Sequence, residues 1–380
     1  MSEKNTEIEA LRAVAIGSNL CQHFPLLFPA LGGPDWLRWI YEHVAFWCGA
    51  DLFFTVSGFV VASSLMRGLE RAQNEGVSRW GYVKRFWVRR VFRLFPQAWF
   101  WLIVVLLGCI YFNRSVIFGT IEANLKQALM ITFYVYNWFV YWLNAANVTI
   151  APLGVYWSLA VEEQFYIVLP ILFLLFRTRS LIVLLLFAIA AQFFIWRPAP
   201  WYEPWWGLRC ETLAWGVLLA FFARTPRFAV LRQRATMLAT RKWAAWLVNI
   251  ALMFALVVLP WRFFNVSFIT GLVAIACMIW VGLAIVEHDL TLPGIAHKPW
   301  VQWLGNRSYA IYLSHFPAYM CVHEIAFRLD AAGIITFGWH WVPCAVALAL
   351  LLAALGAELT HWLIEDPLRD YGRRMSERVR

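Results

Sequence analysis

Long apolar runs dominate the chain, and short polar stretches separate them. Most of these runs hold about 20 residues, the length that a helix needs to cross a bilayer. They lie at residues 10–30, 44–66, 94–112, 125–145, 153–176, 180–196, 207–223, 243–260, 264–286, 303–326 and 341–364. The pattern predicts an all-α fold, a polytopic bundle of helices embedded in a membrane.

The positions of the basic residues predict how many runs cross. Lys and Arg cluster between the runs, at residues 67–93, 224–242 and 369–380. Cytoplasmic loops carry an excess of Lys and Arg. If all eleven runs crossed, the second and third clusters would lie outside, so one run between the first two clusters must not span. We choose 125–145, which has a polar start and many Tyr and Trp residues, as interfacial segments do.

This choice predicts about ten transmembrane helices with both termini cytoplasmic, in a multi-pass protein of the cell (inner) membrane. The linker 197–206 and the loop 327–340 then face outward. No segment is long enough for a separate soluble domain. We therefore expect one integral membrane domain at residues 1–370 and a basic cytoplasmic tail at 371–380, with a helix ending before Pro367.

Composition supports a membrane protein. The chain of 380 residues is 62% hydrophobic and 14% charged, whereas a soluble domain has about 25% charged residues. The net charge of +10 is explained by loop topology, so we expect membrane lipids and no nucleic acid as partners. The seven cysteines lie in apolar runs without a CxxC pair, which favours small buried side chains over disulfides or a metal site.

Seven ionisable side chains lie within or at the rim of apolar runs. A charge at the centre of a membrane helix costs at least ~2.5 kcal/mol, so such groups usually face a shared polar interior. They are His23, Asp51, Glu162, Glu163, Arg209, Glu211 and His315. This pattern is typical of a membrane enzyme or of a transporter.

Arg12 and His23 are eleven residues apart on one expected helix. Eleven residues make about three turns, so both side chains point the same way roughly 16 Å apart along the axis. Arg12 near the inner surface suits an anionic group arriving from the cytoplasm. His23 lies deeper, where a neutral imidazole can accept a proton from a hydroxyl. A structural role for this histidine is the alternative.

The segment GADLFFTVSGF, residues 49–59, places Asp51 in an aromatic run. Asp51 either orients His23 or pairs with an arginine for structural reasons. Gly49, Ser57 and Gly58 permit a close approach of another helix.

The segment KRFWVRRVFRLFP, residues 84–96, contains Arg89, Arg90 and Arg93. Arg89 and Arg93 are four apart and share a helix face. Arginine forks bind phosphate oxygens in pairs, so a phosphate clamp is one interpretation. Anchoring at the membrane surface is the other.

In WSLAVEEQFY, residues 157–166, Glu162 and Glu163 cannot both face one pocket. One of them either charge-balances His23, or binds a substrate hydroxyl, or interacts favourably with the helix dipole. Trp157 and Tyr166 are candidates for stacking on a sugar.

Arg209 and Glu211 are two residues apart and do not face each other on a helix, so each needs a partner elsewhere. Glu162, Glu163 or Asp51 can supply a partner for Arg209. Farther along, Ser308, Tyr312 and His315 lie along one helix face, with His315 either a structural hydrogen-bonding group or a catalytic one.

These motifs, in this order and over nearly the whole chain, resemble those of the acyltransferase 3 family of integral membrane acyltransferases. The resemblance is carried by IEALRAVAIGSNLCQHF, where Arg12 and His23 reproduce the Arg-x10-His signature, and by GADLFFTVSGF, RRVFRLFP, WSLAVEEQFY, RCETLAWG, GNRSYAIYLSHFP and IEDP. Some members carry an additional SGNH hydrolase-like domain, for which this chain has no room.

The resemblance implies an O-acyltransferase that moves an acyl group, usually acetyl, from cytoplasmic acyl-coenzyme A to a hydroxyl. Acetyl-coenzyme A is then a donor substrate, and no cofactor is bound permanently. The implied acceptor is a cell-envelope polysaccharide or a lipid-linked glycan, or else a macrolide-type small molecule.

In this scheme Arg12, Arg89, Arg90 and Arg93 bind the donor, and His23 is the base. Asp51, Glu162 and Glu163 are the carboxylates that assist it. The expected acceptor-binding residues are Trp157, Tyr166, Arg209, Glu211, Tyr312 and His315. A transporter or flippase that uses the same polar interior without chemistry is the rival hypothesis.

Overall fold

The computed structural model describes residues 5–27, 34–146, 151–195, 204–263, 265–266 and 268–378. All regular structure in these segments is helical, and none of their residues lies in a strand. The predicted all-α fold is therefore confirmed. Most of the linker 197–206, for which an outward orientation is predicted, lies outside the described residues.

Five helices in the described part of the chain are long and apolar enough to cross a membrane, or six if one bent pair counts as a span. The five spans are Phe46–Asn74, Arg79–Tyr111, Tyr156–Leu175, Lys242–Arg262 and Trp339–Arg378. These helices fit a polytopic membrane protein. The number of ten crossings is not confirmed, because two further apolar helices are only 16 residues long.

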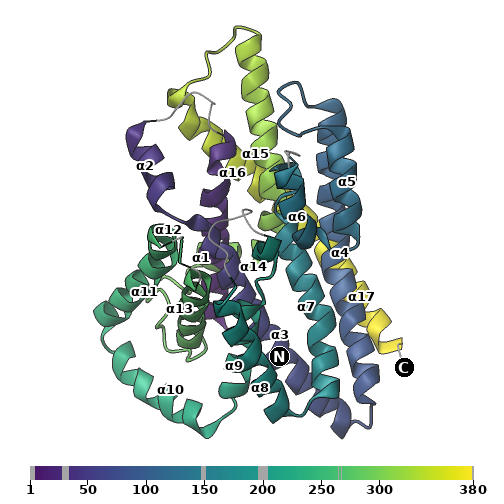
Figure 1. Ribbon diagram of the computed structural model, residues 1–380, viewed down its shortest axis with the longest axis vertical. Helices are drawn as coiled ribbons and strands as arrows, with labels where there is room; N and C mark the ends of the chain where they lie inside the picture. Colours follow the sequence, from purple (N-terminus) through teal and green to yellow (C-terminus); the bar gives the residue numbers. More distant parts are fainter. Residues whose placement is uncertain are drawn as a thin grey trace. The chain divides into compact units, whose positions relative to one another are not determined.

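The chain forms two compact units, each made of segments distant in sequence. Unit 1 comprises Met1–Asn19, His43–Val83 and Gln164–Ser308. Its helices are α3 (Gly49–Asn74), α8 (Thr178–Phe193), α9 (Cys210–Phe222), α10 (Pro226–Ala239), α11 (Lys242–Val257), α12 (Leu259–Arg262), α13 (Ile269–Ala284) and α14 (Pro299–Asn306), with most of α1 (Thr6–His23) and the second part of α7 (Tyr156–Leu175) (Figure 1).

Unit 2 comprises Leu20–Glu42, Lys84–Glu163 and Tyr309–Arg380. It contains α5 (Ile121–Thr132), α6 (Tyr136–Ala145), α16 (Val342–Thr360) and α17 (Asp366–Arg378), with most of α2 (Asp35–His43), α4 (Arg79–Tyr111) and α15 (Ser308–Ala331). Short 3-10 turns lie at Phe24–Leu27, Phe46–Cys48, Ala151–Leu153, Pro204–Gly207 and Trp339–Trp341.

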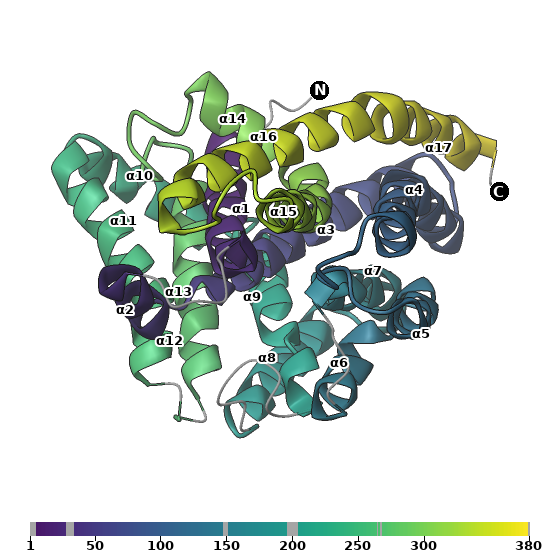
Figure 2. The same ribbon diagram turned by 90° about the horizontal axis from the view of Figure 1, so that it is seen from above.

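Helices α3 and α9 of unit 1 lie side by side along their length (Figure 1 and Figure 2). Glycines make this close approach possible. A Cβ atom on Gly58 would overlap the carbonyl oxygen of Leu213, and one on Gly216 would overlap that of Thr55. The predicted close approach at Gly58 is therefore confirmed, and it fixes α9 beside the segment that carries Asp51.

A buried tryptophan is at the centre of the hydrophobic core of unit 1. Trp280 on α13 is fully buried among side chains from α1, α3, α9 and α11. Its indole N–H donates a hydrogen bond to Asn249 Oδ1 at 2.8 Å, which satisfies the one polar atom of the ring.

The run 125–145 does not form one helix. It breaks between α5 and α6, and Tyr134 at the break has φ +54°, a left-handed conformation that ends a helix. At 12 and 10 residues, neither helix reaches the length of about 20 that a span needs. The break agrees with the expectation that 125–145 is no ordinary crossing, and its placement at the membrane surface stays a prediction.

The expected helix end before Pro367 is wrong. A π turn at His361–Glu365 joins α16 directly to α17, so one long helix continues to Arg378. Pro367 lies inside this helix, directly after the π turn. Proline lacks the N–H that would continue the α-helical hydrogen-bond pattern, and the π turn is where that pattern is interrupted. The predicted tail, residues 371–380, is therefore helical as far as Arg378.

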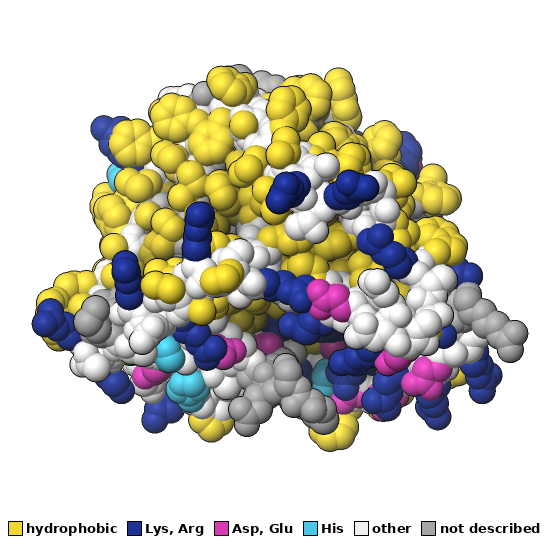
Figure 3. All heavy atoms as spheres, turned by 90° about the horizontal axis from the view of Figure 1, so that it is seen from below, with side chains coloured by type: hydrophobic (Ala, Val, Ile, Leu, Met, Phe, Trp, Pro, Cys, Tyr) yellow, Lys and Arg dark blue, Asp and Glu magenta, His cyan; other side chains and the backbone are white. Residues whose placement is uncertain are grey.

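Polar pairs and aromatic contacts hold the long helices of unit 2 together. Gln97 on α4 donates to the Thr360 hydroxyl at 2.8 Å, and both side chains are buried. Farther along, the Phe92 ring contacts Tyr371. Lys and Arg side chains are numerous on the face shown in Figure 3, beside large areas of hydrophobic side chains.

Candidate active site

His23 is paired with a second histidine in unit 2. Its Nδ1 atom lies 3.0 Å from Nε2 of His315, and the two ring centroids are 5.1 Å apart. His23 is the last residue of α1 and half-buried, whereas His315 on α15 is fully buried. Both histidines are predicted site residues, but the sequence gives no indication that they contact each other.

The hydrogen bonds of His315 fix the tautomers of both rings. His315 Nδ1 lies 3.2 Å from the carbonyl oxygen of Ile311, which can only accept, so Nδ1 must carry the proton. In the neutral ring Nε2 is then an acceptor, and His23 Nδ1 must donate to it. Nε2 of a neutral His23 consequently bears the lone pair and can accept a proton.

Aromatic rings enclose this histidine pair. Phe316 packs edge-on against His23, with 4.5 Å between ring centroids. Tyr312 and Tyr319 lie next to His315 on the same helix, at 5.7 and 5.5 Å. The surroundings are therefore apolar apart from the hydroxyls, and an apolar environment favours neutral imidazole over imidazolium.

Ser158 on α7 makes a hydrogen bond beside the histidine pair. Its hydroxyl hydrogen-bonds to that of Tyr312 at 2.6 Å, and both side chains are buried. Tyr312 is thus held in a defined position beside His315. Sequence reasoning missed Ser158, although the residue lies within the WSLAVEEQFY motif.

The two adjacent carboxylates of α7 have different surroundings within unit 2. Glu163 is buried and lies within electrostatic range of the Arg90 guanidinium and of the Tyr134 and Tyr309 hydroxyls. Glu162 is half-buried and within range of Tyr312. Glu162 is therefore close to Tyr312, and Glu163 is close to Arg90. Tyr134 and Tyr309 were not recognised from the sequence.

The three candidate phosphate-binding arginines lie half-buried on α4. Arg90 stacks over the Phe86 ring at 5.3 Å and is also the arginine near Glu163. Arg89 lies 3.4 Å from the Ser376 hydroxyl. Arg93 is one turn farther along the same face as Arg89. The arginines thus have different neighbours: Arg90 lies near Glu163, and Arg89 lies near Ser376.

Asp51 and Arg209 form a buried ion pair in unit 1. Arg209 Nη2 lies 2.5 Å from Asp51 Oδ2, and its guanidinium stacks over the Trp47 ring at 4.9 Å. This contact selects Asp51 from the three partners that the sequence left open for Arg209. Glu211, two residues on, is also buried. The orientation of His23 by Asp51 stays a prediction.

Other predicted site residues of unit 1 have local partners. Tyr166 shares a 2.8 Å hydrogen bond with the Ser57 hydroxyl, which joins α7 to α3. Arg12 pairs with Glu9 on its own helix at 2.8 Å, and 21% of the Arg12 side chain is exposed. Arg12 and His23 do lie on one helix, α1, as their spacing predicts.

Trp157, a predicted site residue of unit 2, is half-buried.

The fold and these groups define the class: a helical membrane protein with a paired imidazole and several buried ionisable side chains. A family model described as "Acyltransferase domain" matches residues 5–358. The chain belongs to this family, acyltransferase 3, which confirms the family and the class of enzyme predicted from the sequence.

Two curated relatives are peptidoglycan O-acetyltransferase OatA of Listeria monocytogenes and O-acetyltransferase OatA of Staphylococcus aureus. The first is 25% identical over 96% of this chain and 56% of its own length. The second is 28% identical over 85% of this chain and 53% of its own length. The chain thus spans about half the length of these relatives. No solved structure matches it.

Proposed function

We propose that the protein is a membrane O-acetyltransferase that transfers an acetyl group from acyl-coenzyme A to a hydroxyl of a cell-envelope glycan. Membership of the acyltransferase family supports the reaction class, and relatives named peptidoglycan O-acetyltransferases support a glycan acceptor. The apolar helices support a multi-pass membrane location, which we assign to the cell (inner) membrane.

The single observation that carries the mechanism is the hydrogen bond from His23 Nδ1 to His315 Nε2. With its tautomer fixed, His23 accepts the acceptor hydroxyl's proton at Nε2 as that oxygen attacks the thioester carbonyl. Collapse of the tetrahedral intermediate forms the ester and expels the coenzyme A thiolate, and His23 returns the proton to the sulfur. General-base help of this kind typically contributes 10²–10⁴-fold in rate.

The charged residues divide between the two substrates in this proposal. Arg89, Arg90 and Arg93 of unit 2 bind the phosphates of the donor, since arginine suits phosphate recognition. Glu162, Tyr312 and Trp157, all of unit 2, contact the acceptor. Asp51 and Arg209 hold α3 and α9 in place, which makes their role in binding indirect.

Purified protein in proteoliposomes, supplied with radiolabelled acetyl-coenzyme A and peptidoglycan fragments or lipid-linked glycans, tests the proposal. The wild type should move label into the glycan, and His23→Ala should reduce the rate at least ~100-fold. Equal thermal stability of the two proteins in detergent shows that the loss is chemical. Full activity of His23→Ala would remove His23 from the mechanism, and glycan that stays unlabelled with every donor would favour a transporter.

A further inference from the structure

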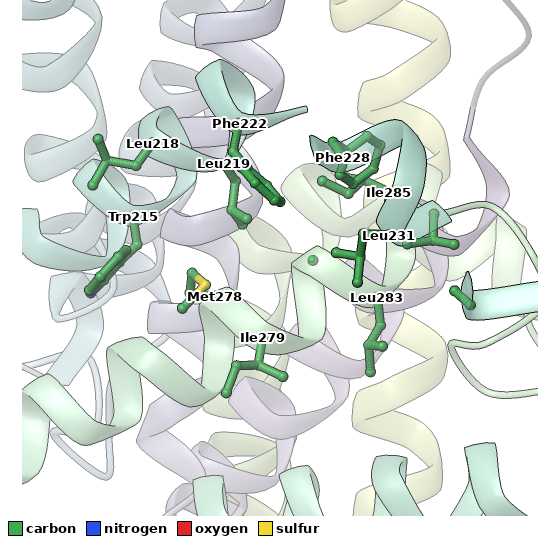
Figure 4. Close-up of a pocket in the computed structure, with 13 residues that line it drawn as sticks. Trp215, Leu218, Leu219, Phe222, Phe228, Leu231, Met278, Ile279, Leu283 and Ile285 are labelled. Carbon is green, nitrogen blue, oxygen red and sulfur yellow. The ribbon is translucent and has the colours of Figure 1, made fainter. Parts of the chain in front are cut away.

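Unit 1 contains an apolar cavity that includes neither histidine of the pair. Its volume is about 380 Å³, and thirteen side chains from α9, α10, α13 and the segment that follows α13 line it (Figure 4). Trp215 and Leu218 on α9, Leu231 on α10 and Ile279 on α13 surround the same space. A volume of this size lies in the range of pockets that hold small molecules.

The cavity is open to the surroundings on one side. Several lining side chains are exposed, among them Leu231 at 47%, Ile279 at 44% and Phe222 at 37%. Its walls offer almost no hydrogen-bonding group, and a water molecule needs two to four polar partners to be held. The walls therefore favour a hydrocarbon occupant.

The helices on either side of the opening meet at a sharp bend. Helices α9 and α10 are joined by a short break and cross at 92°. At 13 residues, α9 is too short to cross a bilayer alone. If it enters the membrane at its junction with α10, then α10 lies along the membrane surface. The opening of the cavity then falls at the boundary between the acyl chains and the headgroups.

The surface of α10 carries positive charge beside this opening. Phe228, Leu231 and Ala235 line the cavity, with the i, i+3, i+7 spacing of one helix face. Arg227 and Arg234 are exposed on the neighbouring face of the same helix. Arg224 and Arg232 are engaged with Glu70 and Glu287, respectively. Arg227 and Arg234 are thus the α10 residues best suited to meet an anion.

We propose that this cavity binds one acyl chain of an anionic phospholipid, whose phosphate headgroup contacts Arg227 and Arg234. The apolar walls take the chain, and each buried methylene group favours binding. The arginines give preference for a net negative headgroup over a zwitterionic one, because both present a phosphate but only the first has a net charge to attract.

A protein helix is a poorer occupant. One helical turn with side chains is about 10 Å wide and 5.4 Å long and fills roughly 420 Å³, so the cavity would take no more than a single turn. A single acyl chain is narrower and can enter through the side opening. This site shares no residue with the histidine pair, and the proposal does not depend on acetyl transfer.

Photocrosslinking tests the proposal directly. The full-length protein is reconstituted with phosphatidylglycerol that carries a diazirine in one acyl chain, or with the matched phosphatidylcholine, and adducts are mapped by mass spectrometry. Adducts on Leu218–Phe222 and Met278–Ile285 are expected, more from phosphatidylglycerol than from phosphatidylcholine. Adducts spread evenly over all apolar helices would overturn the proposal.

Two pairs of variants test binding of the acyl chain and binding of the headgroup separately. A Cβ atom on Gly282 would meet only Leu219 Cδ2, at 3.8 Å, so α13 tolerates a side chain there. Gly282→Leu fills the cavity and should reduce the α9 and α13 adducts at least ~5-fold, whereas Gly282→Ala should change them little.

Arg227→Gln together with Arg234→Gln should leave the adduct sites in place and reduce the preference for phosphatidylglycerol, by about fivefold for each arginine. The matched control is Arg177→Gln with Arg179→Gln, which removes the same charge from exposed residues at the start of α8. An equal loss of preference in the control would show bulk electrostatics only. Unchanged adducts in Gly282→Leu would show that the chain does not enter the cavity.

Discussion

Asp51 and Arg209 form an ion pair at 2.5 Å with only 1% of either side chain exposed. The pair joins α3 to the start of α9, and the Trp47 ring covers the guanidinium. Two charges withdrawn from solvent stabilise the fold only while each compensates the other.

Removal of one partner of this pair should therefore be costly. Arg209→Leu should lower the stability of the detergent-solubilised protein by about 3–5 kcal/mol, because it leaves the Asp51 carboxylate buried without its cation. The double variant with Asp51→Asn should recover part of the loss. Thermal unfolding followed by tryptophan fluorescence measures both. An equal loss in the single and double variants would contradict charge compensation.

His315 should act through His23. His315→Ala removes the acceptor of the His23 Nδ1 proton, so the base loses its fixed tautomer, and kcat should fall about 10–100-fold with little change in KM. His315→Gln should restore part of the rate, because its amide oxygen can accept in place of Nε2. Rates of acetyl transfer over a pH range measure the effect.

His323→Ala is the matched control for His315. His323 also lies on α15, and its Nδ1 atom is 3.0 Å from the backbone carbonyl oxygen of Leu26. It is part-buried, and no described hydrogen bond or ring contact joins it to His23 or His315. Its kcat should stay within about twofold of the wild type. Equal losses for His315→Ala and His323→Ala would reduce the role of His315 to packing.

The stability of the protein should be sensitive to replacement of Gly58 by even the smallest side chain. Gly58→Ala places a methyl group against the Leu213 carbonyl, where backbone cannot yield, and should lower stability by about 1–3 kcal/mol. Gly17→Ala on α1 is the control, because nothing lies within 4 Å of its Cβ position. There the exchange should be neutral or stabilising by up to about 1 kcal/mol. Thermal unfolding of both variants is the measurement.

Glu7 should stabilise the loop that follows α13. Its buried carboxylate accepts from the backbone N–H groups of Asp289, Leu290 and Thr291 at 2.9, 3.1 and 2.7 Å. Glu7→Gln turns one acceptor into a donor that faces these N–H groups, so stability should fall by about 1–3 kcal/mol.

Glu70→Gln is the comparison for Glu7, since Glu70 forms an exposed ion pair with Arg224. Its replacement should cost less than about 1 kcal/mol. The rate of amide hydrogen exchange at residues 287–292 should rise in Glu7→Gln and stay unchanged in Glu70→Gln. Similar exchange in both variants would indicate that the loop does not depend on the carboxylate.

The sequence by itself determined the class of fold and the chemistry available. Apolar runs of bilayer length require helices, because backbone groups in lipid must satisfy one another within a segment. The spacing of Arg12 and His23 fixed their common helix, and Gly58 indicated a close helix approach. The order of motifs identified the family.

Only the tertiary structure decided the pairings. His23 and His315 are 292 residues apart, and no local pattern specifies that their rings meet or which nitrogen carries the proton. Asp51 as the partner of Arg209, and the separate surroundings of Glu162 and Glu163, likewise depend on which helices become neighbours. Helical periodicity acts over three or four residues, whereas packing between helices is set by the whole chain at once.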